Sequence, residues 1–145
     1  LDQRPTLSPE MERFLRAPHP ATIATLDPDG SPRQAVAWFR FDPPDVIVVN
    51  SAVGRRWPAN LRRDPRVAIA VVDPHDPYRW LGLRGRVVEV TADQSIAQAD
   101  IAELARRYMA DDPEGAEALI RDRFQRQQRI SFRIRILGVH DHLAG

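Results

Sequence analysis

The stretch SAVGRRWPANLRRDPRV at residues 51–67 places five arginines between two strongly apolar runs. A guanidinium group keeps its charge at neutral pH, and its forked N–H groups match the oxygens of phosphates and carboxylates. Three interpretations are therefore open for this stretch. It is a face for nucleic acid, a clamp for a small anionic ligand, or a solvated helix whose arginines keep the protein in solution.

Overall charge argues against the nucleic-acid interpretation. The chain of 145 residues has 21 Lys and Arg residues against 20 Asp and Glu residues, which gives a net charge of +1. Such a balance provides no general basic field of the kind that draws proteins to duplex nucleic acid. All of the basic residues are arginine and cysteine is absent, so lysine Schiff bases, thiolate nucleophiles and cysteine-bound metals are excluded.

Other patterns that could carry chemistry are weak. His140 and His142 alternate as two metal ligands on one strand face would, but no third ligand is evident and we expect no metal site. No serine stands in a Gly-x-Ser-x-Gly elbow, and no P-loop or dinucleotide glycine pattern is present. No apolar run approaches the roughly 18 residues of a membrane span, so we expect a cytoplasmic protein that binds no membrane.

The elements that must position the arginines are mostly strands. Barrel strands are predicted over residues 20–90, joined by tight turns such as DPDG at residues 27–30 and interrupted by a helical insert at residues 54–64. One strand is expected to run from Ser31 to Phe41. The runs at residues 46–49 and 67–72 are apolar on both faces, which is typical of strands covered on both sides.

Helical segments flank this region. Ser8 and Pro9 predict the start of a short helix over residues 8–17, and apolar spacing predicts a helical pair over residues 93–125. Strict alternation then predicts a final strand over residues 129–140. We therefore expect a single domain over residues 1–145, mainly β with flanking helices, built on six antiparallel strands that form a small barrel.

At this level the chain resembles the pyridoxamine 5′-phosphate oxidase-like, flavin-binding split-barrel superfamily, and within it the small proteins that use the deazaflavin coenzyme F-420. The resemblance spans nearly the whole chain and rests on the order of five short motifs: PATIATL at residues 20–26, GSPR at 30–33, NLRRDPRV at 60–67, LRGRV at 83–87 and LGV at 137–139. It implies a six-stranded split β-barrel that forms a homodimer, with the cofactor in a groove between the two barrels.

The resemblance assigns the opening stretch to the cofactor phosphate. Arg55 and Arg56 would hold the phosphate at the start of the short helix, while Arg63, two turns further along, would lie in solvent. The family often has a lysine at the position of Trp57, and an indole cannot serve as a counter-ion. Asn60 would either contact the cofactor or fix the helix against the barrel.

Strand residues are implied near the ring system of the cofactor. They are Gln34, Val36 and Trp38 from the second strand and Asn50 and Ser51 from the end of the third. Plain core or dimer packing is the alternative for Trp38.

The function that this implies is hydride transfer between reduced F-420 and a small organic acceptor. An FMN-dependent oxidase or reductase is one alternative, and a non-catalytic carrier of a flavin, haem or other apolar ligand is another, because a fold does not determine a function.

Overall fold

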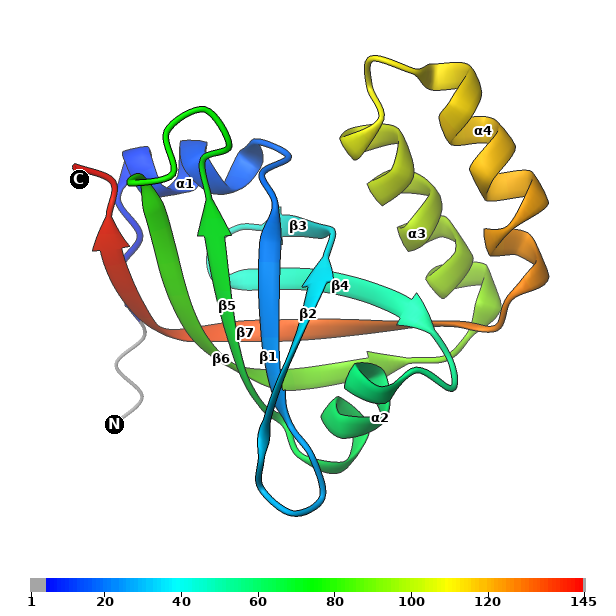
Figure 1. The fold of residues 1–145 in the computed structure, drawn as a ribbon, viewed down its shortest axis with the longest axis horizontal. Coiled ribbons are helices and arrows are strands. Elements are labelled where there is room, and N and C mark those ends of the chain that lie inside the picture. Colours follow the sequence, from blue (N-terminus) through cyan, green and yellow to red (C-terminus); the bar gives the residue numbers. More distant parts are fainter. Residues whose placement is uncertain (1–4, 145) are drawn as a thin grey trace.

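The computed structural model describes residues 5–144, which form one antiparallel sheet with helices around it (Figure 1). Its strands are β1 (Ala21–Leu26), β2 (Pro32–Ala37), β3 (Phe39–Asp42), β4 (Val46–Ala52), β5 (Arg66–Val72), β6 (Trp80–Thr91) and β7 (Arg129–His142). Its helices are α1 (Pro9–Arg16), α2 (Arg56–Arg63), α3 (Gln94–Tyr108) and α4 (Pro113–Asp122), followed by the 3-10 helix η1 (Phe124–Arg126). The predicted class, mainly β with flanking helices, is confirmed.

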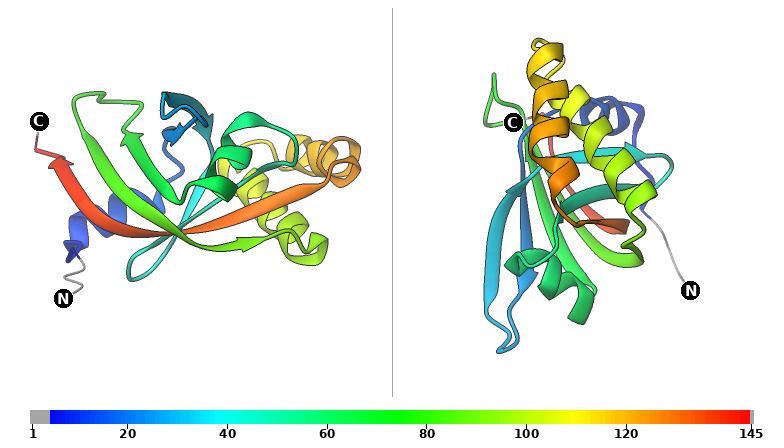
Figure 2. Two further views of the ribbon diagram at one scale, coloured as in Figure 1. Left: turned by 90° about the horizontal axis from the view of Figure 1, so that it is seen from below. Right: turned by 90° about the vertical axis from the view of Figure 1, so that its right-hand side faces the viewer.

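The sheet curls into a half-barrel whose strand order is β2-β1-β5-β6-β7-β4-β3. The two long strands β6 and β7 bend as a pair through the whole molecule (Figure 2). Their register shifts next to Gly85, where a Cβ atom would lie 2.6 Å from Cγ2 of Ile134. Only glycine permits that approach, so this residue provides one of the corners that a small barrel needs.

Seven strands lie within residues 5–144, and the prediction of six was wrong at one place. The run expected as a single strand from Ser31 to Phe41 is divided at Trp38 into β2 and β3, which lie at opposite edges of the sheet. The Trp38 ring stacks on Tyr108 with 5.3 Å between centroids, and the Phe39 N–H donates to the Tyr108 hydroxyl. Helix α3 therefore takes the backbone group that a continuous strand would have paired.

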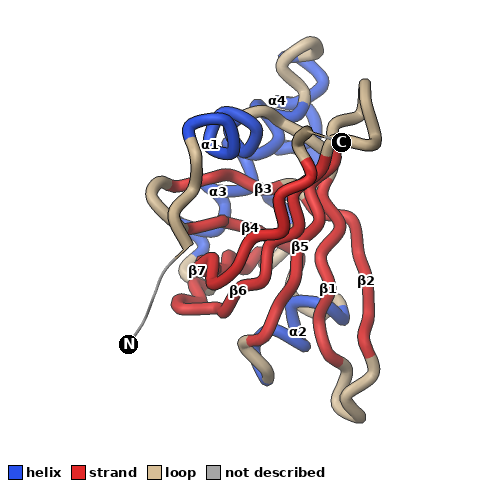
Figure 3. Tube along the Cα trace, turned by 90° about the vertical axis from the view of Figure 1, so that its left-hand side faces the viewer, coloured by secondary structure: helices blue, strands red, loops and turns tan. Residues whose placement is uncertain are grey.

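The two apolar runs differ in how they are covered. Strand β4 is buried along almost its whole length, because the barrel core lies on one face and α3 packs on the other. Strand β5 alternates buried and exposed residues, and its exposed positions include Ala68 and Ala70. Figure 3 shows β5, β1 and β2 side by side, with α2 near their lower ends. One face of this part of the sheet is thus uncovered in the single chain.

Two apolar clusters stabilise the fold. The larger fills the half-barrel and includes Phe39, Trp57 and Phe132. The smaller lies between α3 and α4 and includes Ile101 and Phe124, with Trp38 packed against it. None of the helices in the described part of the chain has the length and apolar character of a membrane-spanning segment.

Arg107 holds the N-terminal helix against α3. Its guanidinium donates to the carbonyl oxygens of Leu15, Arg16 and Ala17 at distances of 3.1, 2.6 and 2.8 Å. These carbonyls end α1, where the helix dipole is negative and the backbone lacks intrahelical donors. The same guanidinium lies over the Phe39 ring, 5.5 Å from its centroid. One side chain therefore joins α1, β3 and α3.

We expect Arg107→Gln to lower the free energy of unfolding by about 2 kcal/mol, because hydrogen bonds from a charged donor to the end of α1 are lost. Arg106→Gln is the matched control, since Arg106 is exposed and its ion pair with Glu117 lies at the surface. Urea unfolding followed by circular dichroism measures both. Equal losses for the two variants would contradict the anchoring role of Arg107.

Candidate functional site

A cavity of about 290 Å³ lies between the half-barrel and the helical pair α3–α4. The end of strand β4 and the start of helix α2 each contribute lining residues. The junction of β2 and β3 forms another wall. The lining residues are Val36, Ala37, Trp38, Asn50, Ser51, Arg55, Trp57, Ile101, Leu119, Arg123, Phe124 and Arg129. Six of the residues predicted to contact a cofactor are thereby brought together: Val36, Trp38, Asn50, Ser51, Arg55 and Trp57.

Three arginines give this cavity a positive charge. Arg55, Arg123 and Arg129 come from three different segments of the chain and all line it. No ion pair between any of them and a carboxylate is found within residues 5–144. Like charges gathered without counter-ions raise the electrostatic energy of the ligand-free protein, and an anion in the cavity would lower it.

Arg129 is the buried member of the three, with 2% of its surface exposed, whereas Arg55 and Arg123 are exposed. Its Nε donates to Oδ1 of Asn50 at 3.0 Å and its Nη1 to Oε1 of Gln127 at 2.6 Å. Burial, together with the charges of Arg55 and Arg123, lowers the pKa of Arg129 to about 10. The guanidinium still carries its charge at neutral pH, but within residues 5–144 it contacts two amide oxygens and the Phe124 ring, 4.8 Å from the centroid, and no carboxylate.

The hydroxyl of Ser51 supplies a second unmet polar group. Ser51 is 1% exposed, and its Oγ has no hydrogen-bond partner among the described residues. A buried hydroxyl without a partner costs free energy, and a ligand oxygen can relieve that cost. The Arg129 guanidinium, which has no carboxylate partner, and the unpartnered Ser51 hydroxyl thus fit an anion with several oxygens, such as a phosphate.

The start of α2 lies beside the same cavity, which Arg55 and Trp57 line. Arg55 is the N-cap residue of α2, and no side chain caps this end of the helix. The first N–H groups of a helix have no intrahelical partner and favour negative charge. The start of α2 and the guanidinium groups therefore both favour a negatively charged group in the cavity.

Trp57 lines the cavity from the side of the barrel core. Its indole is 8% exposed and packs against Phe132, with 6.0 Å between the ring centroids. The positive charge that the resemblance puts at this position is thus missing from α2. Arg123 and Arg129, which lie more than sixty residues further along the chain, bring positive charge to the same cavity.

Arg56 and Asn60 lie outside the cavity. Arg56 is exposed, with its Nη1 3.8 Å from Oδ2 of Asp27. Asn60 is buried, and its Nδ2 donates to Oγ1 of Thr25 at 3.0 Å and to Oδ1 of Asp27 at 2.9 Å. The hydrogen bond from Asn60 to Asp27 is the main cause of the lowered pKa of Asp27. Asn60 therefore fixes α2 against β1 and the turn that follows it.

Arg63 is exposed, as its place on α2 predicted, but its guanidinium also has partners in the protein. Its Nη2 donates to the carbonyl oxygen of Leu26 and to Oδ1 of Asn60. It thus belongs to the contacts between α2 and the end of β1.

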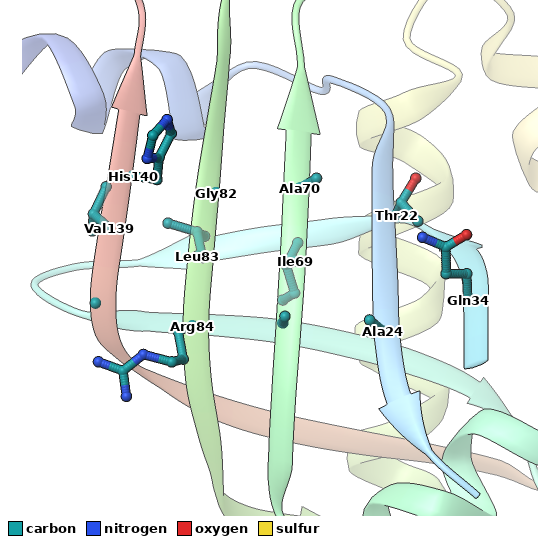
Figure 4. Close-up of a pocket in the computed structure, with 12 residues that line it drawn as sticks. Thr22, Ala24, Gln34, Ile69, Ala70, Gly82, Leu83, Arg84, Val139 and His140 are labelled. Carbon is teal, nitrogen blue, oxygen red and sulfur yellow. The ribbon is translucent and has the colours of Figure 1, made fainter. Parts of the chain in front are cut away.

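Gln34 lines a different, larger cavity of about 550 Å³ on the outer face of the sheet. Figure 4 shows this shallow hollow, with Gln34 and Thr22 on one side and Arg84 and His140 on the other. Its floor is made of small residues, Ala24, Ala68, Ala70, Gly82 and Gly138 among them. The two cavities differ in kind, because the smaller one holds the buried cation and the unpartnered hydroxyl.

The two C-terminal histidines stack on an indole. The centroids of His140 and His142 lie 4.9 and 5.3 Å from that of Trp80. Within residues 5–144 no group of three or more His, Asp or Glu side chains is placed to hold a metal ion.

Sequence reasoning missed Arg129 at the start of β7 and the wall formed by the helical region, which comprises Ile101, Leu119, Arg123 and Phe124. Arg129 stands where the alternation of the last strand begins, and its pairing with Ala52 of β4 brings it close to the start of α2. The one sequence signal for Arg129 as a site residue was a basic side chain at the start of the last strand, whose first residues are buried. Its proximity to Arg55 follows only from the long-range register.

A curled antiparallel half-barrel with a cation-lined cavity at its helical end defines a split-barrel protein. The family model of pyridoxamine 5′-phosphate oxidase matches residues 7–142, and the chain belongs to this family.

Three relatives illustrate the family. The chain is 30% identical over 121 residues to an F420H(2)-dependent biliverdin reductase of Mycobacterium tuberculosis, which covers 83% of this chain and 85% of the relative. A solved structure described as an F420 reductase is similar with a TM-score of 0.71 and 27% identity, covering 89% of this chain and 94% of that one. The heme storage protein HutZ from Vibrio cholerae has the same fold, with a TM-score of 0.66, 19% identity and coverage of 96% and 95%.

We expect Arg129→Gln to weaken the binding of inorganic pyrophosphate by roughly ten- to a hundredfold, the loss of about 1.5–3 kcal/mol from a charged hydrogen bond. Arg121→Gln is the control, because Arg121 is exposed and pairs with Asp122 on the outer side of α4. Isothermal titration calorimetry at low salt measures both. Equal, salt-screened losses would show that the arginines act only as surface charge.

Proposed function

We propose that this chain is an oxidoreductase that binds reduced coenzyme F-420 and transfers a hydride from it to a small organic acceptor. The observation that carries the proposal is the composition of the smaller cavity. It combines a buried guanidinium without a carboxylate partner and an unpartnered hydroxyl, and none of its lining residues is an acid, a histidine or a lysine. Such a wall can bind and orient a ligand, but the reactive group must come with the ligand.

The residues present fit a phosphate-bearing flavin analogue. Arg55, Arg129 and the hydroxyl of Ser51 would hold its phosphate oxygens, and Arg123 would add charge at the rim. Trp38 and Phe124 offer aromatic surface on the same cavity. Bound in reduced form, F-420 supplies a hydride, and the relatives that use F-420 support this cofactor over others.

The acceptor is proposed by class only. Biliverdin is the first compound to test, because the curated relative from Mycobacterium tuberculosis is a biliverdin reductase. Quinones, unsaturated lactones and nitro compounds are further acceptors of a hydride. The chain itself would contribute orientation and exclusion of water rather than a proton-transferring side chain at the cavity.

We expect the purified protein to bind F-420 and Arg55→Ala to weaken that binding by roughly tenfold or more, since Arg55 lines the cavity at the N-cap of α2. Arg56→Ala removes the same charge from the neighbouring residue, which lies outside the cavity, and is expected to weaken binding much less. Fluorescence titration with F-420 and FMN measures affinity, and oxidation of reduced F-420 with biliverdin measures turnover.

The outcomes separate the alternatives. Tight binding of FMN with no affinity for F-420 would favour an FMN-dependent enzyme. Binding of either cofactor without turnover of any acceptor would favour a carrier. Equal losses for Arg55→Ala and Arg56→Ala would contradict the assignment of the phosphate to this cavity.

A second copy of the chain is proposed to cover the outer face of the sheet. The cavity of about 290 Å³ is just below the size range of ligand pockets, roughly 300–1,000 Å³, so a whole cofactor would extend beyond the walls that one chain provides. Val36 is 78% exposed at the rim of this cavity, and Gln34 of the same strand lines the outer hollow. Small residues such as Ala68 and Ala70 allow another sheet to approach closely.

We expect light scattering to give a mass twice the 16.5 kDa of one chain, and Ala68→Arg to shift it toward that of one chain by placing a large charged group on the outer face. Ala110→Arg, at an exposed position between α3 and α4, is the control and should leave the mass unchanged. A parent protein with the mass of one chain would overturn the dimer.

A further inference from the structure

A chain of hydrogen bonds leads from the cavity to a carboxylate on α3. Nε of Arg129 donates to Oδ1 of Asn50 at 3.0 Å, and Nδ2 of Asn50 donates to Oγ of Ser131 at 2.9 Å. The Ser131 hydroxyl donates in turn to Oδ2 of Asp100 at 2.7 Å. Arg129, Asn50 and Ser131 are buried, so water does not compete for these bonds.

Every link of this chain points in the same direction. Nδ2 of Asn50 gives its second hydrogen to the carbonyl oxygen of Ala97 at 2.9 Å, which fixes the amide so that its oxygen faces Arg129. The hydroxyl of Ser131 accepts from Asn50 and therefore donates its single proton to Asp100. Donors thus run from the guanidinium to the carboxylate without a reversal, and aligned bonds of this kind strengthen one another.

The chain leaves one edge of the Arg129 guanidinium available. Nε and Nη1 are used by Asn50 and Gln127, while no hydrogen bond within residues 5–144 uses Nη2. Arg129 also lines the cavity, so the unused nitrogen remains for a ligand there. The carboxylate of Asp100 acts through two neutral side chains and does not itself pair with the guanidinium.

A direct ion pair would have the opposite effect. A carboxylate at the position of the Asn50 amide would neutralise Arg129 and compete with an anionic ligand for it. Asp100 is held apart, because Nη1 of Arg40 also donates to its Oδ1 at 3.3 Å. The arrangement therefore keeps the buried cation oriented and still unneutralised.

We propose that Asn50, Ser131 and Asp100 are positioning residues that aim Arg129 at the phosphate group of the ligand in this cavity. The inference rests on the proposed function for the identity of the ligand, but it concerns any phosphate bound there. Asp100 and Ser131 do not line the cavity, and they act on the ligand only through Asn50 and Arg129.

The test compares two carboxylates of the same network. Asp100→Asn removes the charge at the end of the chain without changing the side chain's shape. Asp42→Asn is the matched control, because Asp42 pairs with Arg40 at 2.8 Å and with Arg133 at 2.6 Å but has no bond toward Arg129. Ser131→Ala breaks the chain in its middle and serves as the second variant.

Isothermal titration with inorganic pyrophosphate is expected to show affinity about fivefold weaker for Asp100→Asn and Ser131→Ala than for the parent, the equivalent of one hydrogen bond. Asp42→Asn is expected to match the parent. The same variants are then titrated with F-420 and with the phosphate-free 5-deazaflavin chromophore. A positioning role lowers the affinity for F-420 and leaves the affinity for the chromophore unchanged, whereas general loosening of the site lowers both.

Equal losses for Asp42→Asn and Asp100→Asn, or equal losses for the two chromophore ligands, would overturn the proposal. So would a parent protein that binds no pyrophosphate. Pyrophosphate binding that depends on Asp100, in a parent that binds neither F-420 nor FMN, would support the positioning chain and reject the proposed function. Binding of F-420 that Asp100→Asn and Ser131→Ala leave unchanged would support the proposed function and reject the positioning chain.

Discussion

The docking of Trp38 on the helical pair is the contact on which the rest of the structure depends. Its indole stacks on Tyr108 and meets Phe124 edge to face, with 6.3 Å between the centroids. Tyr108 also donates from its hydroxyl to the carbonyl oxygen of His19, and burial raises its pKa. The edge strands β2 and β3 are joined through Trp38, so the chain passes from one edge of the sheet to the other beside α3. The cavity lies at that crossing point, so closing the half-barrel and building the site are one event.

Charge in the interior is arranged for binding rather than for stability. A buried guanidinium is stabilised best by a carboxylate in direct contact, and Arg40 shows that pattern, with Asp42, Asp100 and Glu103 around it. Arg129 is more deeply buried, yet its hydrogen bonds go to amide oxygens alone. Two arginines of the same protein thus follow different rules. The difference marks the cavity, since an unmet charge is tolerated where a ligand of opposite sign completes it.

Local patterns were sufficient for the class of fold and insufficient for the site. Alternation and tight turns predicted antiparallel strands because both depend on neighbours in sequence. The break at Trp38 was missed, since the alternation continues through it and the interruption comes from Tyr108, seventy residues away. Arg55 was predicted through the family resemblance, which places the phosphate at the start of this helix. Arg129 was not, because its place depends on the register between β4 and β7. Residues that a remote strand delivers leave little trace in a single sequence.

The position of β7 has a consequence for how the chain acquires its structure during synthesis. Within residues 5–144, β7 follows the other six strands in the sequence, yet it is an interior strand of the sheet and it alone joins β6 to β4. Until it arrives, a nascent chain carries two unpaired strand edges, and the hairpin of β3 and β4 has no attachment to the other strands. Exposed strand edges can pair with the edges of other incomplete chains. Neighbouring nascent chains of this protein would therefore tend to aggregate at this stage. A complete native sheet therefore requires β7 to have left the ribosome, and chaperones that shield open strand edges have most to protect before that point.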